Sequence, residues 1–167
     1  MNRWILLILF GLVYHAAIAQ NLSRSCNSPG CSQFDFWLGD WNLTWGDTSK
    51  GTNSVMKILD GCVINENFND PASQYRGMSW SKYDSAKATW KQTWVDNQGG
   101  YITLTGKFAA GEMVLYTEPS IAAGGKMVTM RMKFYNINPE SFDWNWESSS
   151  DKVNWKVNWK IHYQRKK

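Results

Sequence analysis

The chain has 167 residues, which suffices for one domain with a hydrophobic core. Its 18 Lys and Arg residues against 14 Asp and Glu residues give a formal net charge of +4, and the end at 165–167 (RKK) supplies much of the excess. No basic stripe runs along the sequence, so a nucleic-acid partner is not expected.

The first 19 residues have the pattern of a cleaved secretory signal. Arg3 gives a short positive region, an apolar run follows over 4–13, and Ala-Ile-Ala at 17–19 fits a small-residue cleavage site. The apolar run is short for a membrane span, and no second apolar segment follows. We expect cleavage before Gln20, a secreted or periplasmic location, and no transmembrane segment in the mature protein.

Three cysteines remain after that cleavage: Cys26, Cys31 and Cys62. Outside the reducing cytosol two of them would form a disulfide, and the odd number leaves one thiol over. The residues alone allow two pairings with Cys26. A bridge to Cys31 would be local, whereas a bridge to Cys62 would tie the N-terminal arm to a strand.

From residue 40 onward the sequence predicts short strands separated by turns. Turn-forming clusters such as WGDTSKG, DNQGG and AAGGK recur about every ten residues, a spacing typical of an all-β sandwich or barrel. Such short connections make neighbouring strands antiparallel. The ten predicted strands span 40–46, 52–59, 62–69, 75–83, 89–96, 100–107, 112–117, 126–135, 141–148 and 153–164.

Alternation of apolar and polar residues shows which face of the sheet is buried. In the last strand one face carries Trp155, Val157, Trp159, Ile161 and Tyr163, and the other face carries Lys, Asn and His. We expect an all-β fold: a single closed or nearly closed antiparallel barrel of about ten strands over 34–167, preceded by an arm at 20–33.

Two features at the ends of this pattern resemble the lipocalin and calycin arrangement. Gly39 and Trp41 open the first strand, and Arg165 closes the last. The resemblance implies that Arg165 packs as a cation over the Trp41 ring, and that the N-terminal segment plugs the barrel. The stretch FDFWLG at 34–39 is therefore interpreted as a short plug of Phe34, Phe36, Trp37 and Leu38.

Blocks along the mature chain resemble a family of secreted bacterial proteins of unknown function, related in fold to fatty-acid-binding-protein-like and nitrobindin barrels. These blocks are QFDFWLGDW, LDGCVINENF, GMSWSKYD, WKQTWVDNQGG and WESSSDKVNW. The resemblance implies a barrel with a pocket and a Cys26–Cys62 disulfide, with Cys31 as the spare thiol. It implies no catalytic residue.

Eleven tryptophans less Trp4 leave ten in the mature chain. They indicate either a filled aromatic core or a cavity that holds a small hydrophobic or lipid-like ligand. For a cavity, the predicted lining residues are Trp80, Trp90, Trp94, Tyr101, Trp144 and Trp146. Glu66, Gln92 and Arg131 are predicted to contact the polar group of the ligand, unless Glu66 and Gln92 belong to an internal hydrogen-bond network.

Other functions receive less support from the residues. A pocket enzyme (isomerase, cyclase or hydrolase) would use Glu66 or Asp96 as its acid or base, although Asp96 also fits a hairpin cap. Sugar binding would need an exposed row of tryptophans. The nitrobindin resemblance raises haem binding through His162, but that residue shares the polar face of its strand. No cofactor and no metal site are expected.

Overall fold

The structure is a computed structural model that describes residues 26–167, so the predicted signal segment at 1–19 lies outside the described residues. Two 3-10 turns, η1 (Pro29–Ser32) and η2 (Asp35–Trp37), precede an all-β domain. The strands are β1 (Gly39–Trp45), β2 (Ser49–Ile58), β3 (Val63–Asp70), β4 (Tyr75–Asp84), β5 (Thr89–Asp96), β6 (Tyr101–Ala109), β7 (Glu112–Tyr116), β8 (Ser120–Ile121), β9 (Met127–Tyr135), β10 (Ser141–Ser149) and β11 (Lys156–Arg165).

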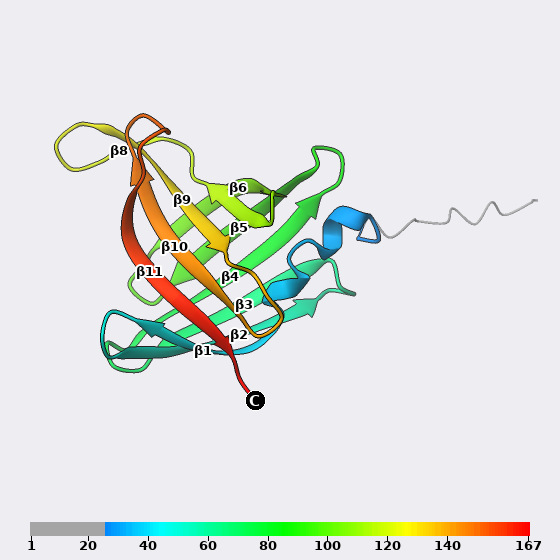
Figure 1. Cartoon of the computed structure of the whole chain (residues 1–167). Helices are drawn as coiled ribbons and strands as arrows, with labels where there is room; N and C mark the ends of the chain where they lie inside the picture. The colour runs from blue at the N-terminus through cyan, green and yellow to red at the C-terminus, as the bar shows by residue number, and fades with distance from the viewer. Residues whose placement is uncertain (1–25) are drawn as a thin grey trace, which may run out of the picture.

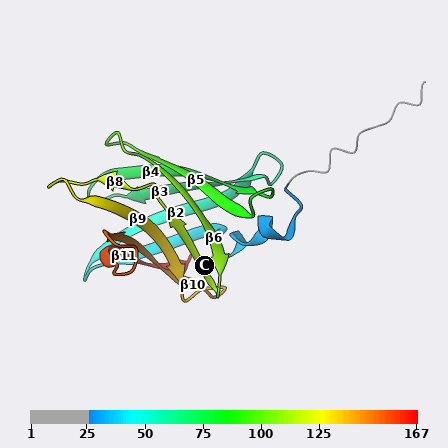
Figure 2. The ribbon, with the colours of Figure 1, turned by 90° about the horizontal axis from the view of Figure 1, so that it is seen from above.

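Ten of these strands form a closed antiparallel barrel (Figures 1 and 2). Consecutive strands pair from β1 to β7, β7 pairs with β9, and β10 and β11 lead back to β1. Trp41 pairs with Arg165 at the closing seam. The predicted fold and its ten strands are confirmed. The additional strand β8 lies outside the barrel on β9, and its two residues are too few to show alternation.

The last strand does not keep one phase along its length. Trp146 pairs with Trp159, whereas Glu147 pairs with Val157, so Asn158 forms a β-bulge. Trp159 and the residues after it keep the predicted inward phase. The prediction that Trp155 and Val157 face inward is wrong: Val157 is 48% exposed, and the Trp155 ring lies over the guanidinium of Arg131.

The stretch 34–38 closes one end of the barrel, as predicted. Phe34 and Trp37 are fully buried, and Phe36 and Leu38 pack against the core around them. The Phe34 ring lies edge-on to Trp90 at 4.9 Å and to Phe134 at 5.3 Å between centroids. Aromatic pairs at this spacing and angle are favourable beyond their buried area, so the plug is part of the core.

The seam between the first and last strands carries the expected cation over an indole. The Arg165 guanidinium lies 4.2 Å from the Trp41 ring centroid, and its Nη1 donates to the carbonyl of Leu38 at 2.9 Å. Gly39 has a φ of +115°, and a Cβ there would come within 2.6 Å of Arg165 Nη1. A side chain at position 39 would therefore displace the guanidinium.

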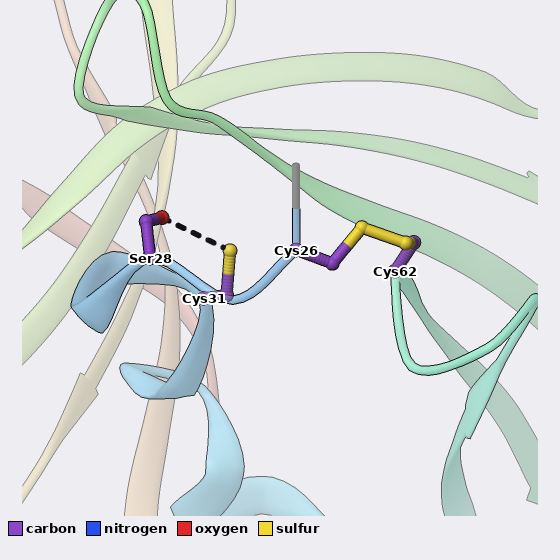
Figure 3. The surroundings of a disulfide bond; sticks show 4 residues. All are labelled: Cys26, Ser28, Cys31 and Cys62. Atoms are coloured by element: carbon purple, nitrogen blue, oxygen red, sulfur yellow. Dashed lines mark hydrogen bonds between the residues drawn. A yellow bond between two sulfur atoms is a disulfide. The ribbon is translucent and has the colours of Figure 1, made fainter. Parts of the chain in front are cut away.

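A disulfide joins Cys26 to Cys62, at the turn between β2 and β3 (Figure 3). It ties the arm to the plugged end of the barrel, and it confirms the predicted pairing. The Cys31 thiol lies 3.2 Å from Ser28 Oγ. Disulfides are typical of proteins outside the reducing cytosol. Over residues 26–167, no helix has the length and apolar character needed to cross a membrane.

Candidate functional site

The barrel encloses a cavity of about 130 Å³ between the plug and the opposite end. Most of its walls are aromatic, and they come from the plug and from seven strands. Tyr75, Trp146 and Trp159 are half-buried, which places the open side of the cavity near them. The lining residues are Trp37, Glu66, Phe68, Tyr75, Trp94, Ile102, Met132, Phe134, Trp144, Trp146, Trp159, Ile161 and Tyr163.

Glu66 is the acidic group of this lining. It lies on the inward face of β3 and is only 5% exposed. Its Oε1 accepts a hydrogen bond from Asn53 Nδ2 at 2.7 Å, and its Oε2 accepts one from Ser79 Oγ at 2.5 Å. Burial raises the pKa of the Glu66 carboxyl from its ordinary value of 4.5 to about 7, although these two hydrogen bonds act to lower it.

A chain of polar side chains continues from Glu66 across the inner wall. Gln92 Nε2 donates to Ser79 Oγ at 3.1 Å, and Asn53 Nδ2 also reaches the Tyr163 hydroxyl at 3.3 Å. The predicted internal network around Glu66 and Gln92 is therefore present. Within 26–167, four buried polar atoms have no hydrogen-bond partner in the chain: Trp37 Nε1, Asn53 Oδ1, Ser81 Oγ and Gln92 Oε1. Of these four residues, only Trp37 lines the cavity.

Asp96 positions two aromatic side chains at the cavity wall. Its Oδ2 accepts hydrogen bonds from the Tyr75 hydroxyl at 2.9 Å and from Trp94 Nε1 at 3.1 Å. Its Oδ1 accepts the backbone amides of Gln98 and Gly100, as a hairpin cap does. Desolvation acts to raise the Asp96 pKa, but these four hydrogen bonds outweigh it, so the pKa is lowered.

The aromatic rings near the open side meet at steep angles. Trp159 is perpendicular to Trp144 at 5.7 Å and nearly so to Phe68 at 5.7 Å between centroids. Phe68 in turn meets the Trp94 ring at 6.2 Å. In such packing the edge of one ring meets the face of its neighbour. A ring face carries negative potential, which matters for the kind of guest that the cavity favours.

The structure brings together only some of the residues predicted for the site. Glu66, Trp94, Trp144 and Trp146 line the cavity. Gln92 is buried behind Ser79 and contacts the cavity only through the hydrogen-bond chain. Trp90 is buried at the plugged end, where its Nε1 donates to Gln33 Oε1 at 3.1 Å.

Trp80 and Tyr101 lie on the outer surface, 38% and 70% exposed. Small residues carry the inward phase of β4, namely Gly77, Ser79 and Ser81, so Trp80 faces outward. Ile102 carries the inward phase of β6 at the same end. Among the described tryptophans Trp80 is the one more than a third exposed, so that part of the chain has no row of exposed tryptophans for sugar binding.

Arg131 also lies outside the cavity. Its Nε donates to Glu147 Oε2 at 2.5 Å, and the Trp155 ring covers its guanidinium at 3.9 Å. Both ends of this ion pair point outward because Met132 and Phe134 carry the inward phase of β9. A ligand in the cavity would therefore not contact the Arg131 charge.

Several residues of the site, in the lining or in contact with Glu66, were not predicted to belong to it. Trp159 and Tyr163 were visible in the alternation of the last strand, but nothing in the sequence separates cavity lining from core filling. Asn53 and Ser79 are polar residues in inward phases, where the pattern alone suggests solvent. Their position follows from the register of β2, β3 and β4, which the sequence does not specify.

The residues present do not fit a histidine-ligated haem. His162 faces away from the cavity, and its Nδ1 lies 2.9 Å from Asp143 Oδ1 on the outer surface. No histidine of the described part of the chain lines the cavity. Residues 26–167 contain no group of three or more His, Cys, Asp or Glu side chains that could hold a metal ion.

The fold and the site define a closed antiparallel β-barrel with an aromatic internal cavity, an architecture compatible with ligand binding. Comparison of the chain with protein-family models finds no match. Comparison with curated proteins finds no significant match either.

Proposed function

We propose that this protein is an exported binding protein that holds a small, largely apolar molecule in the barrel. The observation that carries the proposal is the aromatic-walled cavity of about 130 Å³ with one buried carboxyl group, Glu66, in its lining. Pockets with mostly apolar walls and few polar groups are typical of small-molecule sites. Export is supported by the Cys26–Cys62 disulfide and by the signal pattern at 1–19.

The size of the cavity favours a compact ligand. Pockets for drug-sized ligands measure roughly 300–1,000 Å³, whereas a cavity of about 150 Å³ in another protein admits benzene. A guest of one ring or similar size fits the space between Trp94, Trp144 and Trp159. Burial of its apolar surface would contribute about 25 cal/mol per Å² before the entropic costs of binding. A long-chain fatty acid would need side chains to move.

Native mass spectrometry of the exported protein, followed by denaturing extraction, tests the proposal. We expect a bound small molecule in the wild type and its loss in Ile102→Phe, because Ile102 lines the cavity and the larger ring fills it. Ile121→Phe is the matched control, because Ile121 is 73% exposed on β8. Equal occupancy of the Ile102→Phe and Ile121→Phe variants would contradict a ligand in the cavity.

One observation favours a second candidate, a pocket enzyme. Acid–base catalysis works best when the pKa of the group lies near the working pH, and burial brings the pKa of Glu66 to about 7. The extracted molecule, returned to the protein, would then be converted by the wild type and left unchanged by Glu66→Gln. Unchanged ligand with the wild type would leave binding alone.

A further inference from the structure

The charges around the cavity have one sign. Over the described residues, the lining holds the carboxyl group of Glu66 and no Lys, Arg or His side chain. Asp96 adds a second carboxylate behind the wall, where it holds Tyr75 and Trp94. Arg131, the cation that the sequence predicts for the site, is paired with Glu147 on the outer face. An anionic head group would therefore enter the barrel without a counter-charge and would face Glu66.

Glu66 has hydrogen-bonding capacity left for a guest. An ionised carboxylate accepts about four hydrogen bonds, and Asn53 and Ser79 supply two of them. The residue is more than nine-tenths buried and also belongs to the cavity lining, so the remaining lone pairs are out of reach of bulk solvent. A donor on the guest would meet a strong acceptor in a medium of low polarity.

The aromatic walls favour the same kind of guest. Ammonium groups are attracted to the faces of Trp, Tyr and Phe rings within about 6 Å. Tyr75, Trp94, Trp146 and Trp159 line the space toward the open side, beyond Glu66. A positive group on the guest would be shielded from water by these rings and paired with the carboxylate at once.

We propose that the cavity selects a compact protonated amine, whose ammonium group binds Glu66 and whose apolar body packs between the tryptophans. The inference rests on the proposed binding function and names the class of ligand. It excludes fatty acids and other anionic amphiphiles as the preferred ligands, even though the barrel resembles those that carry them.

Three probes of one shape test the inference: benzylamine, benzyl alcohol and benzoate, titrated by calorimetry at pH 8. We expect the wild type to bind the amine about tenfold more tightly than the alcohol, with benzoate weakest. In Glu66→Gln the preference for the amine should fall to about twofold or less. Asp47→Asn removes one carboxylate from an exposed turn and should keep the wild-type preference.

A second measurement needs no variant. The groups that face Glu66 are Asn53 from β2, Ser79 and Tyr75 from β4, and Tyr163 from β11, with Asp96 behind Tyr75. Burial and the Glu66 charge raise the Tyr163 pKa, so this phenol stays neutral near pH 7. At pH 6.5 the amine should displace a proton from Glu66, seen as a dependence of the binding heat on the buffer. Benzyl alcohol should show no such dependence.

The outcomes separate the two proposals. If the alcohol binds and the amine binds no more tightly and releases no proton, the cation inference is overturned while the binding function stands. If no probe binds to the wild type at millimolar concentration and no molecule is extracted, the binding function itself fails, and the inference fails with it. Tighter binding of benzoate than of benzylamine would also overturn the inference.

Discussion

The indole of Trp94 occupies the space that a side chain at position 77 would fill. A Cβ on Gly77 would lie 1.9 Å from Cζ2 of Trp94 and 2.3 Å from its Cη2. Gly77 is on β4 and Trp94 on β5, where it pairs with Ser79. The absence of a side chain at Gly77 thus lets the Trp94 ring pack directly against the sheet. The indole Nε1 donates a hydrogen bond to Asp96 Oδ2 at 3.1 Å.

We expect Gly77→Ala to destabilise the fold by about 1–3 kcal/mol, because the new methyl group displaces the Trp94 ring from its packing position on β4. Displacement of the ring also changes the cavity wall, so benzyl alcohol should bind more weakly. Urea unfolding and calorimetry measure the two effects. In the background of Trp94→Leu the same alanine should cost less, since the ring is gone. Equal costs in both backgrounds would contradict the contact.

Glu66 should make stability fall as pH rises from about 4.5 to about 7. Its folded-state pKa of about 7 lies above its ordinary value of 4.5. Between these values the unfolded chain loses the proton while the folded one keeps it, so the free energy of unfolding decreases with pH. The contribution is fully present below pH 4.5 and is lost by about pH 7, a total of about 3 kcal/mol.

The pH dependence of Glu66→Gln isolates this contribution from those of other carboxyl groups. The amide does not ionise, and Asn53 can present its unpartnered Oδ1 as an acceptor. The wild type minus variant difference in unfolding free energy should decline between pH 4.5 and 7 and then level off. Asp47→Asn, at an exposed turn, should leave the wild-type curve unchanged. A flat difference for Glu66→Gln would show that the carboxyl is not desolvated.

The fold could be predicted because its signals are local. Turn clusters and period-2 alternation fixed the ten barrel strands, and Trp41 and Leu43 showed the inward face of β1. The cavity could be predicted only in part. On β4 the inward positions carry small residues, so the larger apolar residue Trp80 was assigned to the inner face although it faces outward. The single extra residue Asn158 reverses Trp155, and a bulge leaves no mark in the alternation until the pairing is known.

The polar residues of the site could not be recognised from the alternation along single strands either. Asn53 and Ser79 reach Glu66 because three strands place them side by side on the inner face. A sequence read strand by strand shows each of them as an ordinary polar position. The ion pair of Arg131 and Glu147 could not be recognised from single strands either, since it joins β9 to β10 and the Trp155 ring that covers the Arg131 guanidinium precedes β11.

Removal of the disulfide should cost stability through the unfolded chain. Cys26 and Cys62 are 36 residues apart, and a loop of that length corresponds to about 3–4 kcal/mol of lost chain entropy in the unfolded state. We expect the double variant Cys26→Ser/Cys62→Ser to unfold at a lower urea concentration than the wild type. Reduction by dithiothreitol should lower the unfolding midpoint of the wild type toward that of the double variant. Cys31→Ser should keep wild-type stability and a mass two hydrogens below the reduced value. A destabilised Cys31→Ser variant that lacks this mass deficit would contradict the observed pairing.

Arg165 should stabilise the seam between the first and last strands, β1 and β11. Its guanidinium lies over Trp41 and donates to the carbonyls of Leu38 and Pro139 at 2.9 and 2.7 Å. Lysine keeps the charge but has no planar fork to serve several carbonyls and an indole face together. We therefore expect Arg165→Lys to lose about 1–3 kcal/mol of unfolding free energy, and Arg165→Met to lose at least as much.

Lys107 occupies an exposed position of β6 and provides the control for removal of a positive charge. Lys107→Met should alter the free energy of unfolding by about 0.5 kcal/mol or less. Hydrogen exchange adds a spatial readout. In Arg165→Lys the amides of the plug and of the β1–β11 seam should exchange faster, because Arg165 contacts these segments. The amides of β4 and β5 should keep their protection, because Arg165 does not contact those strands. Uniform loss of protection across the barrel would show instead that Arg165 supports the whole core rather than its seam.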